Sequence, residues 1–208
     1  MLILAADTSL PLLSVALLDG PSLIGDVALE GKGSRNEKLL PAIDWLLGES
    51  GVDRSNIGLF AVTRGPGSFT GVRIGLATIQ GLALVLGRPV CAMSTHEAIA
   101  MSEDGGRRIV VIDDAGRGEY YVSRFEAGRE VVPPRLASAS ERDQLSASAD
   151  VVISAADFLQ RGNVAASCAR RASAVAERGE LGRYADATPI YVRLAEAEVK
   201  LQRPQNAG

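Results

Sequence analysis

The chain has 208 residues, which is enough for one large domain or for two small ones that share a long boundary. Its composition, with 47% hydrophobic and 23% charged residues, is typical of a globular protein and excludes a disordered or fibrous chain. The 22 basic residues are outnumbered by 25 acidic ones, and the resulting net charge of −3 argues against a protein that grips nucleic acid unaided.

The first thirty residues predict three short strands in an antiparallel meander. Residues 2–6, 14–18 and 23–29 are apolar runs, and Pro11 and Gly20 mark the turns between them. Turns this short join neighbouring antiparallel strands.

A helix is predicted next, because Leu39, Ile43 and Leu46 recur at helical spacing. Pro41 lies inside this run and removes one backbone donor. The sequence leaves open whether the helix begins near Leu40 or is kinked there.

Strands and helices then alternate. Residues 57–63 have the apolar run of a buried strand, residues 72–86 form a second helix, and residues 90–93 form another strand. Ser94 and Glu97 match a capping box at the start of a third helix. Strands that are linked through a helix run parallel, so the order βββαβαβα predicts an α/β fold of the ribonuclease-H-like and actin-like class.

The second half repeats the opening pattern more weakly, which suggests an internal duplication with a reduced second lobe. The strands expected there are residues 107–112, 119–125, 130–132 and 151–153, and the expected helices are residues 165–178 and 194–202. The polar stretch 103–106 is the best internal boundary. We therefore predict a first lobe over residues 1–103, a second over 104–190, and a C-terminal helix within 191–208 that packs back on the first lobe.

The tripeptide Asp7-Thr8-Ser9 closes the first strand, where actin-like ATPases contact phosphate and magnesium and where ribonuclease-H-like nucleases hold a metal carboxylate. These three residues are the candidates for cofactor binding. A nuclease would need further carboxylates near Asp7, and the candidates are Glu37, Asp113 and Asp114. The simpler interpretation, which we favour, is a turn in which Asp7 and Ser9 cap local backbone groups. We predict no cofactor, no metal and no catalytic residue.

The glycine-rich loop after the fourth strand lacks the Lys-Ser/Thr of a P-loop, so a tight turn is favoured over a phosphate cradle. Gly67, Gly71 and Gly75 are spaced by four, as are Ala77 and Gly81. Such spacing leaves a flat helix face on which another backbone can pack closely. This helix is also apolar around most of its circumference, which favours burial against a second protein.

Other features argue for a reducing, cytoplasmic setting. Cys91 and Cys168 are far apart and form no metal-binding pair, and His96, the single histidine, excludes a multi-histidine site. We expect His96 on the surface. The chain opens with no signal peptide, and its most apolar helical run, residues 74–86, is shorter than a membrane span.

With these residues identified, the chain resembles the TsaB family, also called YeaZ. The most specific similarity is the run Gly65-Pro66-Gly67-Ser68-Phe69-Thr70-Gly71-Val72-Arg73. Further matching runs are Asp7-Thr8-Ser9, Leu39-Leu40-Pro41, Asp114 through Tyr121, and Pro189-Ile190-Tyr191-Val192-Arg193.

The resemblance implies a two-lobed actin-like fold and a non-catalytic subunit that does not bind ATP in its own cleft. It implies a heterodimer with the catalytic subunit TsaD, recruitment of the ATPase TsaE to that pair, and only indirect contact with transfer RNA. The first lobe would dock through its helices onto TsaD or onto a second copy of this chain. The residues expected at that interface are Gly67, Phe69, Thr70, Gly71, Arg73, Gly75, Thr78, Leu39 and Ile43.

Three alternatives remain open on the sequence. They are an active actin-like ATPase or kinase, a ribonuclease-H-like metal-dependent nuclease centred on Asp7, and a peptidase, for which no nucleophile–base pair is visible.

Overall fold

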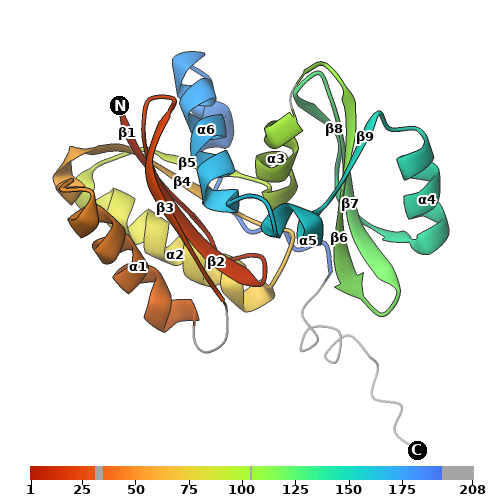
Figure 1. The fold of residues 1–208 in the computed structure, drawn as a ribbon, viewed down its shortest axis with the longest axis horizontal. Coiled ribbons are helices and arrows are strands. Elements are labelled where there is room, and N and C mark those ends of the chain that lie inside the picture. Colours follow the sequence, from red (N-terminus) through yellow and green to blue (C-terminus); the bar gives the residue numbers. More distant parts are fainter. Residues whose placement is uncertain (31–34, 104, 194–208) are drawn as a thin grey trace, which may run out of the picture.

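The computed structural model describes residues 1–30, 35–103 and 105–193. These residues form two sheets with helices around them (Figure 1). The elements in chain order are β1 (Leu2–Asp7), β2 (Leu12–Asp19), β3 (Ser22–Glu30), α1 (Arg35–Glu49), η1 (Arg54–Asn56), β4 (Ile57–Thr63), α2 (Phe69–Leu86), β5 (Val90–Met93), α3 (Thr95–Ala100), η2 (Met101–Glu103), β6 (Arg108–Gly116), β7 (Glu119–Glu126), β8 (Arg129–Ser138), α4 (Ala139–Ala147), β9 (Val151–Ser154), α5 (Ala155–Leu159), α6 (Val164–Glu177) and η3 (Leu181–Tyr184).

The first sheet has the strand order β3-β2-β1-β4-β5. Strands β1, β2 and β3 form the predicted antiparallel meander, and β4 and β5 run parallel to β1 after their helical crossovers. The α/β, actin-like class that the element order predicts is confirmed.

Both faces of this sheet are buried, which explains why its strands are apolar without interruption. Leu4 and Ala6 of β1 point to the face covered by α1 and α2. Ile3 and Ala5 point to the opposite face, which α6 and α3 cover (Figure 1). This second core layer continues without a break onto residues of β6, β7 and β9, so one hydrophobic core joins the two sheets.

The second sheet has the order β8-β7-β6-β9 and repeats the arrangement β3-β2-β1-β4 of the first. Strands β6, β7 and β8 form an antiparallel meander, and β9 runs parallel to β6. The topology therefore agrees with an internal duplication in which the second lobe is reduced. Helix α4 covers the outer face of this sheet (Figure 1).

Several predicted bounds were wrong. The strand expected over 130–132 runs on to Ser138 through Pro133 and Pro134, which is tolerated because β8 is an edge strand with a register shift beside these prolines. The polar stretch after it contains α4, with a capping box between Ser138 and Glu141. Helix α1 begins at Arg35 and includes Pro41.

Helix α6 lies on the first sheet, against β1, β2 and β4, although it falls within the range predicted for the second lobe. The change from the first sheet to the second occurs between η2 and β6. The division of the chain into 1–103 and 104–190 stays a prediction, and the predicted helix 194–202 lies outside the described residues.

Helix α2 is longer than expected, with 18 residues and a mean hydropathy of 1.6. By length and composition alone it could cross a membrane, so the expectation of a run too short to span was wrong. One such helix is weak evidence for a span, because a core helix can have the same composition. About a third of α2, 33%, is buried within the fold, and its exposed residues include Leu84 and Val85 as well as the polar Arg73 and Gln80.

Candidate functional site

The turn between β1 and β2 is sealed inside the protein. Asp7 has no exposed surface, and its Oδ1 accepts hydrogen bonds from the amide of Ser9 at 3.2 Å, from Ser9 Oγ at 2.6 Å and from Thr63 Oγ1. The predicted local capping is therefore present, together with a bond to β4 that the sequence did not indicate. Asp7 Oδ2 is buried without a hydrogen-bond partner among the described residues.

The glycine-rich loop closes over this turn. The amide of Ser68 donates to the carbonyl of Ser9 at 2.7 Å, and Thr8 Oγ1 donates to the carbonyl of Gly71 at 2.6 Å. Gly67 has a φ of +147°, and a Cβ at this position would overlap the carbonyl of Ser9. The glycines thus bring two backbones into contact. No room is left at this turn for a nucleotide phosphate, so Asp7, Thr8 and Ser9 do not fit a nucleotide.

Residues 186–193, which we call the strap, form no helix or strand and run from the glycine-rich loop towards the second sheet. The amide of Ile190 donates to the carbonyl of Arg64 at 2.7 Å, and the Tyr191 ring lies 4.6 Å from that of Phe69. At its end, Arg193 donates to the carbonyl of Ala115 at 2.8 Å and forms an ion pair with Glu119. The strap therefore ties the glycine-rich loop to the β6–β7 hairpin.

Of the three carboxylates expected around Asp7, Asp113 lies near enough for the charge of Asp7 to act on it. Burial, with smaller contributions from the charges of Asp114 and Asp7, raises the pKa of Asp113 to about 6. Asp114 is used locally, since its Oδ1 accepts from the amide of Gly116 at 2.7 Å, and Glu37 is exposed on α1. Within the described residues no group of three His, Cys, Asp or Glu side chains could hold a metal ion.

We predict that Asp7→Asn stabilises the chain by an amount that increases with pH. Burial raises the pKa of Asp7 above its ordinary value of 3.8, so the folded state holds this proton more tightly than the unfolded state. The contribution of Asp7 to stability is therefore full below about pH 3.8 and is lost as the pH rises. Asparagine keeps the oxygen acceptor and carries no charge. Urea unfolding of both chains between pH 5 and 8 measures the difference.

The matched control is Asp150→Asn. Bonds to Arg108 lower the pKa of Asp150 to about 2, so its ionisation is complete throughout this range and its effect should be constant. The prediction fails if the difference in the free energy of unfolding between Asp7→Asn and the wild type becomes smaller towards pH 8. Asp7 would then be ionised in the folded chain, and its charge would stabilise the fold.

The expectation for the segment from Ser94 to Glu97 was partly wrong. Ser94 caps α3 by accepting from the amide of Glu97 at 2.9 Å, but the Glu97 carboxylate turns away to Arg171 and Tyr184. His96 is fully buried rather than on the surface. Helix α3 is covered by α6, α5 and the second sheet, and this tertiary packing outweighs the polarity of the residue.

His96 and Ser123 form a contact that the sequence could not suggest. His96 Nδ1 lies 2.8 Å from Ser123 Oγ, and both side chains are at most 1% exposed. Burial lowers the pKa of His96 to about 3, so the ring is neutral at physiological pH. A substrate could not reach this pair in the folded chain, and it therefore gives no support to a peptidase.

Four of the predicted interface residues are used inside the lobe. Leu39 and Ile43 belong to the core between α1 and the sheet, and Gly71 and Gly75 face the β1–β2 turn. A Cβ on Gly75 would overlap Thr8 Oγ1. These residues pack within the lobe, and their assignment to a partner interface stays a prediction.

The other predicted positions lie nearer the surface. Thr70 and Arg73 are exposed, whereas Gly67, Phe69 and Thr78 are half-buried. Arg73 already donates from Nε to the Tyr191 hydroxyl at 2.6 Å and stacks on the Phe69 ring at 3.9 Å.

The exposed side of α2 is carried instead by its second set of small residues. Ala77 and Gly81 are exposed, and one turn further Leu84 and Val85 are 82% and 85% exposed. Leu40 of α1, which packs beside α2, is 46% exposed, whereas Trp45 lies on the other side of α1, beside Val27 and Leu29 of β3. We call Ala77, Gly81, Leu84, Val85 and Leu40 the helical face. Exposed apolar side chains gathered in this way are typical of protein interaction sites.

Comparisons with known proteins agree with one another over most of the chain. A family model described as "TsaD: tRNA N6-adenosine threonylcarbamoyltransferase" matches residues 33–183. The chain is 30% identical to "tRNA threonylcarbamoyladenosine biosynthesis protein TsaB" of Bacillus subtilis, with 96% of this chain and 97% of that protein aligned. It is 36% identical to the Escherichia coli protein of the same name, over 61% of this chain and only 55% of that one. The solved structure "YeaZ from Pseudomonas aeruginosa" superposes with a TM-score of 0.70 at 26% identity, covering 91% and 99% of the two chains.

Proposed function

The chain belongs to the TsaB (YeaZ) family, and from that premise we propose that it is a non-catalytic subunit of the complex that makes threonylcarbamoyladenosine on transfer RNA. Its relatives are named for the biosynthesis of this nucleoside. The observation that supports a docking role is the helical face, where Leu84 and Val85 are almost fully exposed.

The proposed partner on this face is a TsaD-like catalytic subunit, with a TsaE-like ATPase joining the pair and a second copy of this chain as the competing occupant. Ala77 and Gly81 allow a partner helix to approach α2 closely, since neither carries a long side chain. Burial of Leu84, Val85 and Leu40 would contribute about 2 kcal/mol each of hydrophobic free energy. The net charge of −3 supports a partner that makes most of the contacts with transfer RNA.

A non-catalytic role is supported by the state of the groups that rival functions would need. The Asp7 carboxylate is sealed under the glycine-rich loop, which disfavours an ATPase, a kinase or a nuclease centred on it. The one histidine of the chain is buried and neutral. We infer that the subunit works in the cytoplasm, alongside the enzymes that modify transfer RNA.

The test is depletion of the protein in its own host, followed by mass spectrometry of nucleosides from transfer RNA. Threonylcarbamoyladenosine should fall on depletion and recover with the wild-type chain. It should not recover with Leu84→Glu/Val85→Glu, because burying unpaired carboxylates in an interface costs several kcal/mol. The affinity for the TsaD-like subunit should fall by at least about a hundredfold, measured by size-exclusion chromatography and titration calorimetry.

Val131→Glu/Val152→Glu is the matched control, since it places the same two charges on exposed apolar residues of β8 and β9 in the second sheet. It should rescue as the wild type does. Unchanged nucleoside levels after depletion would disprove the function. Full rescue by the folded Leu84→Glu/Val85→Glu chain would disprove docking through the helical face.

A further inference from the structure

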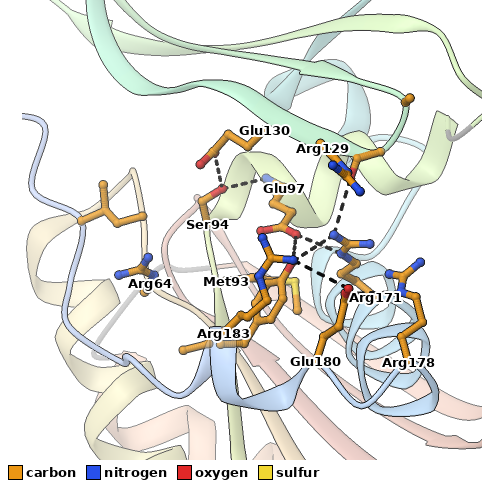
Figure 2. Close-up of a pocket in the computed structure, with 15 residues that line it drawn as sticks. Arg64, Met93, Ser94, Glu97, Arg129, Glu130, Arg171, Arg178, Glu180 and Arg183 are labelled. Atoms are coloured by element: carbon orange, nitrogen blue, oxygen red, sulfur yellow. Dashed lines mark hydrogen bonds and ion pairs between the residues drawn. The ribbon is translucent and has the colours of Figure 1, made fainter.

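A cavity of about 570 Å³ opens beside α6 (Figure 2). It is enclosed by α6, η3, the β7–β8 turn and the N-terminus of α3. Five guanidinium groups from separate parts of the chain line it, those of Arg64, Arg129, Arg171, Arg178 and Arg183. Nothing in the docking role described above requires them.

Arg171 forms the fixed floor of this cavity. Its side chain is 9% exposed, and its Nε donates to Glu97 Oε1 at 2.9 Å while Nη2 donates to the Tyr184 hydroxyl at 2.9 Å. Tyr184 in turn donates to Glu97 at 2.6 Å. The charge of Glu97 is thereby matched, and it does not neutralise the remaining arginines.

The other arginines are held loosely or lack an acidic partner. Glu180 lies 3.4 Å from Arg178 and 3.7 Å from Arg183, so one carboxylate serves two guanidinium groups. Among the described residues Arg129 has no ion-pair partner. Arg64 contacts Asp186 at 3.4 Å, but its Nε is buried without a partner within the same described part.

Glu130, the third acid of the cavity, carries only part of its negative charge near neutral pH. Burial, with a smaller contribution from the nearby charge of Glu97, raises its pKa to about 7. The groups that oppose this shift are Ser94, whose hydroxyl donates to it at 3.4 Å, and Arg64. Near neutral pH the cavity therefore carries clearly more positive than negative charge.

We propose that this cavity binds the phosphate groups of a small ligand, such as pyrophosphate or a nucleoside phosphate. Planar guanidinium groups form paired hydrogen bonds with phosphate oxygens, and several of them around one concave site favour a multiply charged anion. A volume of about 570 Å³ is within the range of small-molecule sites. An acidic chain with its arginines collected in a cavity, rather than along an open surface, fits a small anion better than an RNA backbone.

The test is titration calorimetry of the full, isolated chain with magnesium-free pyrophosphate at pH 8, with ATP as a second arm. Arg129→Gln should weaken binding about tenfold, the typical effect of losing one charge-assisted contact. Glu130→Gln removes a negative charge that faces the ligand, so it should strengthen binding severalfold. Such a gain cannot arise from partial unfolding.

Arg170→Gln is the control, because Arg170 is adjacent on α6 but does not line this cavity. It should bind as the wild type does. If ATP binds and responds to the variants in the same way, the ligand is a nucleoside phosphate. If pyrophosphate binds and ATP does not, the ligand is a simple oligophosphate. The proposal is overturned if neither binds, if only transfer RNA binds, or if all three variants behave alike. Since the partner subunit is absent from this test, its failure would leave the proposed docking untouched.

Discussion

Gly75→Ala should lower the free energy of unfolding by about 2 kcal/mol, whereas Gly81→Ala, six residues further along α2, should raise it by about 1 kcal/mol. Both are glycine-to-alanine changes inside one helix, so the intrinsic gain in helix propensity is the same. They differ in what the new methyl group would meet. At Gly75 it would overlap Thr8 Oγ1, which is held by its bond to the carbonyl of Gly71, and at Gly81 nothing lies within 4 Å.

Urea unfolding of the isolated chain measures both changes. The spacing of the glycines in the sequence predicts Gly75 at a partner interface, where a larger residue would block assembly and leave the lobe folded. In the structure Gly75 packs on the β1–β2 turn of its own sheet, so we expect a larger residue there to disturb the lobe itself. Equal stability of Gly75→Ala and Gly81→Ala would contradict that packing. Gly81→Leu then becomes the appropriate docking variant, since it should fold normally and disturb the helical face.

Arg171→Leu should lower the free energy of unfolding by about 3–5 kcal/mol, the cost of leaving one member of a buried ion pair uncompensated. Arg171 and Glu97 side chains are 9% and 13% exposed, so solvent cannot replace the missing partner. Tyr184 would remain as a single donor to Glu97. The ion pair connects α6 to α3 and thereby holds α6 in place.

Two further variants separate this mechanism from a general loss of packing. Arg171→Leu/Glu97→Leu should recover most of the lost stability, because no charge is then left buried. Arg54→Leu, which breaks an exposed pair with Asp44, should change the stability by less than about 1 kcal/mol. The same urea unfolding curves measure all three chains. If the double variant were as unstable as Arg171→Leu, the loss of stability would have to come from packing contacts of the aliphatic part of the Arg171 side chain.

Much of the fold follows from local patterns. The apolar runs of β1 to β5 and the turns between them are set by residues close in sequence, and they predict the meander and its parallel extension correctly. The acid that ends β1, the cap at Ser94 and the tight loop before α2 are also local features. Each of these depends on hydrogen bonds or steric limits within a few residues, and such limits can be recognised in a linear sequence.

The predictions from the sequence failed where tertiary contacts stabilise a residue in a place that its local preference disfavours. Pro133 and Pro134 are compatible with β8 only because that strand lies at the edge of its sheet. His96 is buried because α6 returns from the second half of the chain and covers α3. Neither fact has a signal in the neighbouring residues.

The sequence by itself determined the order and type of most elements, the family, and the presence of an apolar helix with two sets of small residues. Only the tertiary structure decided that Gly71 and Gly75 face inward and that Ala77 and Gly81 face outward, because both sets have the same spacing and the choice depends on where the β1–β2 turn lies. It also decided that arginines as distant as Arg64 and Arg183 share one cavity. Periodicity records which residues lie on a common side of an element, whereas the neighbour of that side is set by contacts between segments far apart in the chain.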